Sequence, residues 1–341
     1  MQKLGLQGHL WFLVCGIGVL FGVGFAPYLH AAPEGATVFA EVNGQQISQY
    51  EFDAAVHMAA RQRFFHRDAG EGKLAALRLE TAKAIIDRLL LLDEAKRRQM
   101  SVSPSALSAQ VELEAKRFHV DGLGDEHRRK LMASLHEQVK EKLLLRMLEQ
   151  EVKNLTEPGE AAVRHYYEQH LDKFTTPAQL RVSVILLRVA PSSGSAVWQA
   201  AHDEAGRLYA RIQAGADFAE LAQLHSSDAS ADNGGDLGFV HQGMLSPEAQ
   251  EVVDGLAVGQ VSEPVALLQG IAIFQLTERR AAEVNPFERV RQRAISLLQR
   301  ERGEVAWSEL IYALRAKAKI VVRNDGALEQ QIMKDYVPAA E

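Results

Sequence analysis

Apolar residues in the first half of the chain recur at helical spacing. Steps of three and four residues predict helices over residues 71–99 and 125–153. An earlier helix is predicted to begin at Ser48, because Ser48 and Glu51 have the spacing of a capping box, in which each side chain bonds the other residue's backbone N–H. Another is predicted to begin at Ser103-Pro104, with serine as the cap and proline at the first helical position. The apolar stripe over residues 125–153 is expected to comprise Leu131, Leu135, Val139, Leu143 and Met147, with Val152 as a further candidate.

From residue 177 onward the pattern changes to that of a mixed domain. Residues 180–189 are apolar and rich in β-branched side chains, which predicts a buried strand, and a helical pattern follows it. Two more apolar runs, 265–268 and 271–276, are joined by Gln269-Gly270 and predict a hairpin. The chain is therefore predicted to belong to the α+β class, with a helical domain followed by a compact domain in which helices flank an antiparallel sheet.

The end of the chain is predicted to return to its beginning. A long helix is predicted over residues 286–319, and the short apolar run Ile320–Val322 after it is a strand candidate. The strand candidate Val38–Val42 has no other obvious partner. We therefore predict that the two strands pair and that the C-terminal helix packs against the N-terminal helical domain.

The N-terminus has the pattern of an export signal. An apolar run over residues 10–25 is preceded by Lys3 and followed by the small residues Ala31-Ala32, which is the order of regions in a secretory signal. Continued over residues 10–29, the run could instead be retained as a membrane anchor. We therefore expect an exported protein, in the periplasm or anchored facing it. Cys15 is the single cysteine and lies within this run, so the mature chain is expected to have no disulfide.

Composition and charge narrow the possible functions. Hydrophobic residues make up 47% of the 341 residues, which is typical of a folded protein, and the net charge of −6 gives no electrostatic reason to expect nucleic acid as a partner. Histidines and acids between residues 225 and 241 fit neither the spacing of a Ca²⁺ loop nor that of a Zn²⁺ site. No metal or other cofactor is therefore predicted.

A glycine-rich stretch over residues 225–239 is the most specific part of the sequence. Its glycines, at positions 234, 235 and 238, allow backbone angles that other residues disfavour. Asp228 and Asp236 flank the polar turn, and apolar residues follow it at once. The pattern alone is as typical of a surface turn as of a binding site.

An ordered series of motifs around this stretch resembles the parvulin family of peptidyl-prolyl cis-trans isomerases. The series comprises Phe218–Ala222, Ser226-x-Asp228, Gly234–Phe239, Gly243-Met244 and Pro247-Glu248. In the first half, Val42-Asn43-Gly44-x-x-Ile47-Ser48 and Ile86-x-x-Leu89-Leu90 resemble the N-terminal helical domain of exported foldases of the SurA, PpiD and PrsA kind.

The resemblance implies a domain plan. Residues 1–32 would be the signal peptide or anchor, and residues 33–175 a helical, chaperone-like domain. Residues 176–282 would form the parvulin-like isomerase domain, and residues 283–341 a C-terminal helix and tail that pack back on the helical domain.

The resemblance also implies the residues of a site. Asp228 falls at the catalytic acidic position beside the rotating bond, and Ala249 stands where the family has an aromatic pocket residue. Both family histidines are replaced, one by Val184 and the other by Ala272, so the hydrogen-bonded pair that they would form is expected to be absent. The implied substrate-binding residues are Leu237, Phe239, Met244, Ala249, Val184 and Ala272.

Two functional hypotheses follow from this combination. The first is an exported foldase that binds unfolded or proline-containing polypeptide and catalyses cis-trans isomerisation of X–Pro bonds at a low rate. The second is a non-catalytic holdase or assembly chaperone whose parvulin domain only binds peptide. On the second hypothesis, Asp228 would be an Asx-turn residue of the loop rather than a catalytic group.

Overall fold

The structure, a computed structural model, describes residues 37–64, 70–118, 120, 124–323, 326–334 and 336. The chain divides into two compact units, the first containing residues up to 158 and from 296 on, and the second containing residues 159–295. The predicted signal or anchor over residues 1–32 lies outside the described residues. Among those that are described, no helix is both long and apolar enough to cross a membrane.

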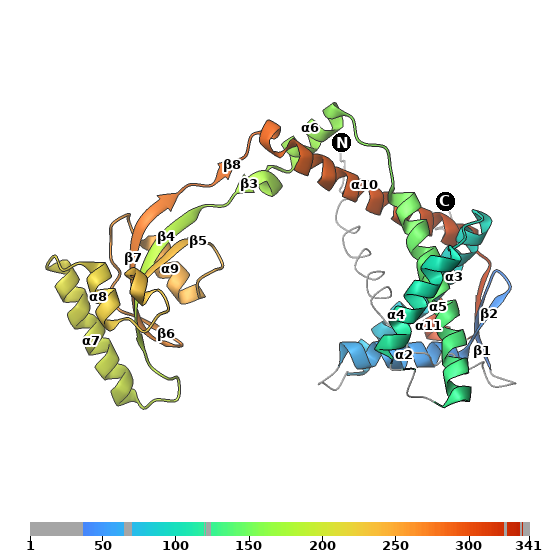
Figure 1. The fold of residues 1–341 in the computed structure, drawn as a ribbon, viewed down its shortest axis with the longest axis horizontal. Coiled ribbons are helices and arrows are strands. Elements are labelled where there is room, and N and C mark those ends of the chain that lie inside the picture. The colour runs from blue at the N-terminus through green and yellow to red at the C-terminus, as the bar shows by residue number, and fades with distance from the viewer. Residues whose placement is uncertain are drawn as a thin grey trace. The chain divides into compact units, whose positions relative to one another are not determined.

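The first unit is mainly helical and carries one small antiparallel sheet (Figure 1). Its strands follow the order β2-β1-β9. The bounds of its elements are β1 (Val38–Val42), β2 (Gln45–Ser48), α2 (Gln49–Arg63), α3 (Glu71–Arg97), α4 (Pro104–Arg117), α5 (Asp125–Lys153), the C-terminal part of α10 (Phe287–Lys317), β9 (Ile320–Val322) and α11 (Gly326–Met333).

Helix starts in this unit follow the predicted capping chemistry. Ser48 caps α2, since its Oγ accepts a hydrogen bond from the Glu51 backbone N–H at 3.2 Å while the Ser48 backbone N–H donates to Glu51 Oε2 at 2.7 Å. Ser103 caps α4 in the same way, its Oγ accepting from the Ala106 N–H at 3.3 Å. The predicted capping box and the predicted Ser-Pro start are therefore confirmed.

The predicted pairing of the two ends of the chain is confirmed. β9 pairs antiparallel with β1, with Ala40 opposite Val322 and Val42 opposite Ile320. Backbone hydrogen bonds continue at both ends of this ladder, including one of 2.7 Å from Arg323 N–H to the Phe39 carbonyl. Strand β1 thus has a partner on each side, and the first unit requires residues from both ends of the chain.

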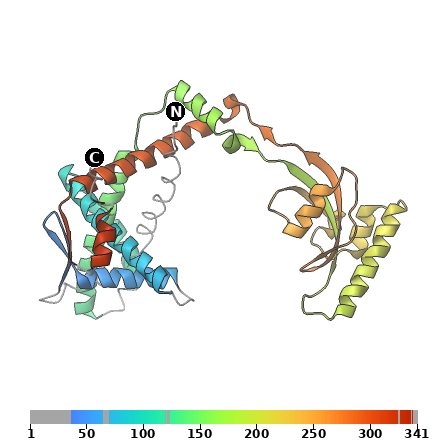
Figure 2. The same ribbon diagram turned by 180° about the vertical axis from the view of Figure 1, so that it is seen from behind.

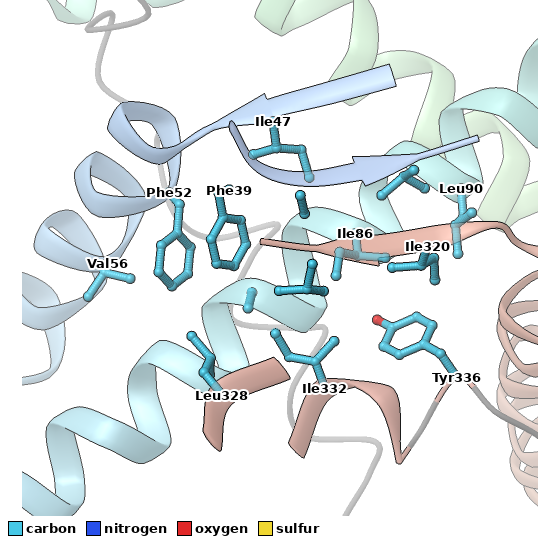
Figure 3. Close-up of a cluster of buried hydrophobic side chains, with 14 residues drawn as sticks. Phe39, Ile47, Phe52, Val56, Ile86, Leu90, Ile320, Leu328, Ile332 and Tyr336 are labelled. Atoms are coloured by element: carbon cyan, nitrogen blue, oxygen red, sulfur yellow. The ribbon is translucent and has the colours of Figure 1, made fainter. Parts of the chain in front are cut away.

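The hydrophobic core of the first unit is also shared between the two ends (Figure 3). The rings of Phe39 and Phe52 stack with their centroids 3.9 Å apart. Ile332 of α11 is fully buried in the same cluster, as is Ile86 of α3. Without α11, the apolar faces of β1 and α3 would be exposed to water, at a cost of about 25 cal/mol per Å² of apolar area.

A buried ion pair fixes the C-terminal segment in place. Arg315 of α10 donates from Nε to Asp87 Oδ1 at 2.8 Å and from its terminal nitrogen to Oδ2 at 2.5 Å. The Tyr336 hydroxyl donates to the same Oδ1 at 3.0 Å. Breaking a buried pair by removing one partner costs about 3–5 kcal/mol, because the other charge remains buried.

The predicted apolar stripe of α5 is confirmed at Leu135, Val139 and Leu143 and misses the residues that are most buried further along. Leu135 and Val139 are buried, and Val139 packs against Leu107 and Val111 of α4. Leu143 packs partly buried against the same cluster. Further along, the buried residues are Leu145 and Leu148 rather than the predicted Met147. The two halves of α5 pack against different partners, because Leu145 and Leu148 belong to a second cluster with residues of α3 and α10. The buried residues of this second cluster are Leu91, Leu92, Ala95, Leu145, Leu148, Trp307 and Ile311.

The second unit is a four-stranded antiparallel sheet with helices on both faces (Figures 1 and 2). Its strands follow the order β5-β4-β7-β6. The bounds are β4 (Gln179–Arg188), α7 (Ser195–Gln213), α8 (Phe218–His225), β5 (Asp236–His241), α9 (Pro247–Gly255), β6 (Val265–Leu267) and β7 (Gly270–Arg280). Shorter elements flank these: α6 (Glu160–Gln169), η2 (Leu171–Phe174), β3 (Thr175–Thr176), η3 (Ala231–Asn233) and β8 (Glu283–Val284).

Alternate residues of the central strands supply the two cores of this unit. Ile185 and Ile273 face α7 and α8, whereas Val184 and Ala272 belong to the cluster that includes Val253 of α9. This alternation is the period-two pattern of a strand buried on both faces. The predicted α+β class, with a helical domain and a compact domain of antiparallel sheet and helices, agrees with the architecture.

Truncation of Ile332 tests how far the first unit depends on its C-terminal segment. We expect Ile332→Ala to lower the free energy of unfolding by about 2–5 kcal/mol, because it removes a fully buried side chain. Val321→Ala is the control, since Val321 is 40% exposed on β9, and it should cost about 0.5 kcal/mol. Urea unfolding followed by far-UV circular dichroism measures both, and equal midpoints for the two variants would contradict the shared core.

The stability of the first unit should depend on pH through Glu94. Hydrogen bonds from Arg97, and then from Arg98, outweigh burial and lower the pKa of Glu94 from 4.5 to about 2. Because the folded-state pKa is depressed, the stabilisation is complete above about pH 4.5 and is lost as the pH falls through 2. We expect Glu94→Gln to melt at a lower temperature than the wild type near neutral pH and to lose less stability across this window. Parallel melting curves across the window would show that Glu94 contributes no such linkage.

Candidate functional site

The glycine-rich loop, residues 226–235, joins α8 to β5 and is hydrogen-bonded along β4. The Val184 N–H donates to the Gly235 carbonyl at 2.8 Å, and the Ser227 N–H donates to the Leu186 carbonyl at 2.7 Å. The Leu186 N–H donates to the Ser226 hydroxyl oxygen at 3.1 Å. The loop therefore continues the edge pairing of β5 along β4, and its position is set by backbone hydrogen bonds.

Glycine is required where the loop approaches β4 and α8 most closely. Gly234 and Gly235 have φ of +66° and +79°, in the left-handed region that favours glycine. A Cβ built on Gly235 would lie 2.4 Å from the Val184 carbonyl oxygen, and one on Gly234 would lie 2.6 Å from the Ala219 Cβ. Gly238 also has positive φ, +71°, but a Cβ there would meet nothing within 4 Å. Gly234 and Gly235 are thus required both for their positive φ and for close packing, whereas Gly238 is required only for its positive φ.

Asp228 lies half-buried within this loop. Its Oδ1 accepts hydrogen bonds from the Ser230 N–H at 2.9 Å and from the Ser230 hydroxyl at 2.6 Å. Its own N–H donates to Ser226 Oγ at 3.2 Å. Asp228 therefore closes an Asx-type turn. The two hydrogen bonds that Ser230 donates are accepted by the same carboxylate oxygen, Oδ1.

Asp236, the second acid of the loop, is held in an ion pair. Arg181 of β4 donates to Asp236 Oδ2 at 2.7 Å, and the Gly238 N–H donates to its Oδ1 at 2.9 Å. The hydrogen bond from Arg181, and then that from Gly238, lower the pKa of Asp236 against the effect of burial. The carboxylate thus stays ionised and fixes the start of β5, which is a structural role.

Several of the predicted substrate-binding residues come together on one face of the sheet. Val184, Ala249 and Ala272 are at most 5% exposed and belong to one apolar cluster beneath α9. Leu237 of β5 is partly buried against the same cluster. Val184 and Ala272, which the sequence resemblance places at the family's histidine positions, therefore lie in an apolar environment.

Two of the predicted residues lie elsewhere. Phe239 pairs with Arg181 across the β4–β5 ladder, and Arg280 stacks over its ring at 3.6 Å from the centroid. Phe239 neighbours Val240, which belongs to the apolar cluster, so Phe239 lies on the opposite face; a register shift between Asp236 and Phe239 lets Leu237 contact the cluster. Met244 is 57% exposed in the connection between β5 and α9.

The structure adds residues that the sequence prediction did not assign to the site. Val265 and Leu267 of β6 pack partly buried against the cluster, as do Leu245 and Val252 from the segment around α9. A signal for Val265 was present in the predicted hairpin, since pairing its two strands places Val265 opposite Ala272. The candidate site is thus a buried apolar cluster between α9 and the sheet, bordered by partly buried side chains of β5, β6 and α9, with the Asp228 loop bonded to β4 at Leu186.

The side chains of this cluster are apolar, so they can contact only apolar groups of a ligand. Among the described residues, no group of three or more His, Cys, Asp and Glu side chains is placed to hold a metal ion. The cluster itself consists of aliphatic side chains and one phenylalanine, Phe274. The partly buried residues at the border of this cluster can contact an apolar side chain or a proline ring, and Asp228 lies in the adjoining loop.

Comparison with protein families identifies the two parts of the chain. Residues 185–278 match the PPIC-type PPIase domain, and residues 2–153 match the SurA-like N-terminal domain. The chain thus combines a segment similar to the SurA-like N-terminal domain with a segment similar to the PPIC-type PPIase domain.

Curated relatives match parts of this chain. Chaperone SurA of Albidiferax ferrireducens is 38% identical over 44% of this chain and 32% of its own length. Chaperone SurA of Pseudomonas putida is 25% identical over 89% of this chain and 72% of its own length. The chain thus spans only about a third of the length of the Albidiferax ferrireducens relative and of two others of similar identity.

Solved structures of similar proteins include PrsA of Bacillus anthracis, which is 22% identical over 75% of this chain and 98% of that one, with a TM-score of 0.29. A SurA-like chaperone of Campylobacter jejuni is 21% identical over 84% of this chain and all of its own, with a TM-score of 0.36.

Alanine at the loop glycines tests the close approach of the loop to β4. We expect Gly235→Ala to destabilise the loop by about 2 kcal/mol or more, because positive φ and contact with the Val184 carbonyl both oppose a Cβ. Gly238→Ala is the matched control, with the same sign of φ and open space, and should cost about 1 kcal/mol. Amide hydrogen exchange at Val184 reports the loop contact. Equal exchange rates in the two variants would show that the contact does not constrain the loop.

Proposed function

We propose that this chain is an exported foldase that binds unfolded or proline-containing polypeptide and catalyses cis-trans isomerisation of X–Pro bonds at a low rate. The observation that carries the proposal is the convergence of Val184, Leu237, Ala249 and Ala272 on one apolar face next to the Asp228 loop. The match of this segment to the PPIC-type PPIase domain supports the same activity.

The reaction needs no nucleophile and no metal. The barrier to rotation about an X–Pro bond is about 20 kcal/mol, and it falls when the twisted amide is favoured over the planar one. An apolar surface can hold the proline ring, and removing water there favours the twisted form, whose carbonyl has lost its conjugation. A carboxylate beside the bond can interact electrostatically with the charge distribution of the twisted amide, and this is the role we assign to Asp228.

The replaced histidines set the expected rate. Val184 and Ala272 cannot donate or accept hydrogen bonds through their side chains, so they supply neither polar support beneath the bond nor orientation of a partner. Replacing both polar members of a pair by apolar groups leaves no buried polar atom unsatisfied, so the domain keeps its fold. We therefore expect catalysis from binding and Asp228 alone, at a rate below that of a domain with the full polar set.

A second function is favoured by the close packing of the cluster. Ala272 is fully buried and Val184 is 5% exposed, so these positions serve as core rather than as catalytic groups. The same chain could then act as a non-catalytic holdase, whose isomerase-like domain holds extended peptide without accelerating rotation. The Asx-type turn made by Asp228 and Ser230 fits this second function equally well.

Location and partners complete the proposal. The apolar run at residues 10–29 supports export to the periplasm, either as a cleaved signal or as an anchor that associates the chain with the membrane. The relatives named Chaperone SurA support unfolded polypeptides as the clients.

An isomerisation assay on the whole chain distinguishes the two functions. We expect measurable acceleration of cis-trans exchange in a proline-containing tetrapeptide, and we expect Asp228→Ala to reduce it about tenfold. Asp232→Ala is the matched control, since Asp232 is an exposed acid of the same loop, and it should leave the rate unchanged. Suppression of aggregation of an unfolded client with no acceleration in the wild type would reject the isomerase and retain the holdase.

A further inference from the structure

A groove of about 480 Å³ lies between α4 and α5 in the first unit, far in sequence from the isomerase domain. Its apolar lining comes from Ala115 and Val120 on one side and from Met132 of α5 on the other. Val120 is 2% exposed, and Met132 packs against the small core between the two helices. The volume lies within the range of ordinary ligand pockets, which is about 300–1,000 Å³.

The rim of this groove is locally cationic. Lys116, Arg128 and Arg129 line it, and Glu112 is the carboxylate among its described lining residues. The chain as a whole has a net charge of −6, so the groove reverses the prevailing sign of the surface. A concentration of one sign of charge beside an apolar floor attracts ligands of the opposite sign that carry an apolar group.

The cations are available for exchange with a ligand. Arg128 pairs with Asp125 at 3.3 Å, and both side chains are well exposed, 45% and 87% respectively. An exposed pair of this kind contributes about 0–1 kcal/mol, so a better-placed carboxylate can replace Asp125 at little cost. Arginine binds carboxylates through two parallel N–H donors, which adds geometric selectivity to the attraction.

We propose that this groove, lined by α4 and α5, binds an acidic segment of a partner polypeptide that carries an apolar side chain. The carboxylates contact Lys116, Arg128 and Arg129, and the apolar side chain lies over Val120 and Met132. Methionine suits this floor, since its flexible side chain adapts to anchors of different shape. The groove is separate from the apolar surface of the isomerase domain, and its action requires no isomerase activity.

Peptide binding to the whole chain tests the proposal. The probe is a fluorescein-labelled peptide in which aspartates and glutamates flank one central leucine, and its anisotropy measures binding. We expect saturable binding that weakens as salt is raised. The double variant Lys116→Glu with Arg128→Glu should weaken it about tenfold or more, because two attractive contacts become repulsive. Lys130→Glu is the control, since Lys130 pairs with Glu126 at 2.8 Å on the same helix and does not line the groove, and it should change binding less than about twofold.

Further probes separate this occupant from the others. A peptide with glycine in place of leucine, and one with lysines in place of the acids, should each bind at least about tenfold more weakly. Arg129→Glu, a single change at another exposed position, should reproduce part of the loss and guards against a folding defect in the double variant. Equal binding of the wild type and both charge variants would overturn the proposal. So would equal binding of the glycine peptide, which indicates charge attraction alone, or a change in sedimentation with unchanged peptide binding, which indicates that a second copy occupies the groove.

Discussion

The close approach of the glycine loop to β4 is the constraint on which the isomerase domain depends. The loop can bond to the strand at Val184 and Leu186 only because Gly235 has no side chain to collide with the Val184 carbonyl. This contact sets where Asp228 lies and where β5 begins, and β5 then contributes Leu237 to the apolar surface. A loop residue with a Cβ at that point would move the carboxylate and the wall of the surface together.

The loss of polar groups from the centre of the sheet is consistent with a stable fold. Val184 and Ala272 face the same cluster from adjacent strands, and both are apolar. Replacing one histidine of a hydrogen-bonded pair would bury an unsatisfied group at a cost of about 1–3 kcal/mol, whereas replacing both avoids that cost. On the proposed function, the domain thus keeps a stable apolar centre without the hydrogen bonds of such a pair.

Local sequence patterns predicted most of the fold, but they did not predict features that depend on which element a helix or strand packs against. Caps such as Ser48 and the pairing of the chain ends follow from short-range chemistry and from an unpartnered strand. The burial of Leu145 and Leu148 did not follow, because α5 turns a different face to a second cluster, and periodicity cannot reveal a change of partner. In the site, motif order located the apolar residues, but only strand register shows that Phe239 points away from them.

The central claim is that proline-containing polypeptide binds on the apolar face beside the glycine loop. Its most direct test is NMR spectroscopy of the chain during titration with a proline-containing peptide. We expect chemical-shift changes at Leu237, Ala249 and Gly235, and faster cis-trans exchange in the bound peptide than in the free one. Shift changes confined to the first unit, with exchange in the peptide unaltered, would contradict it.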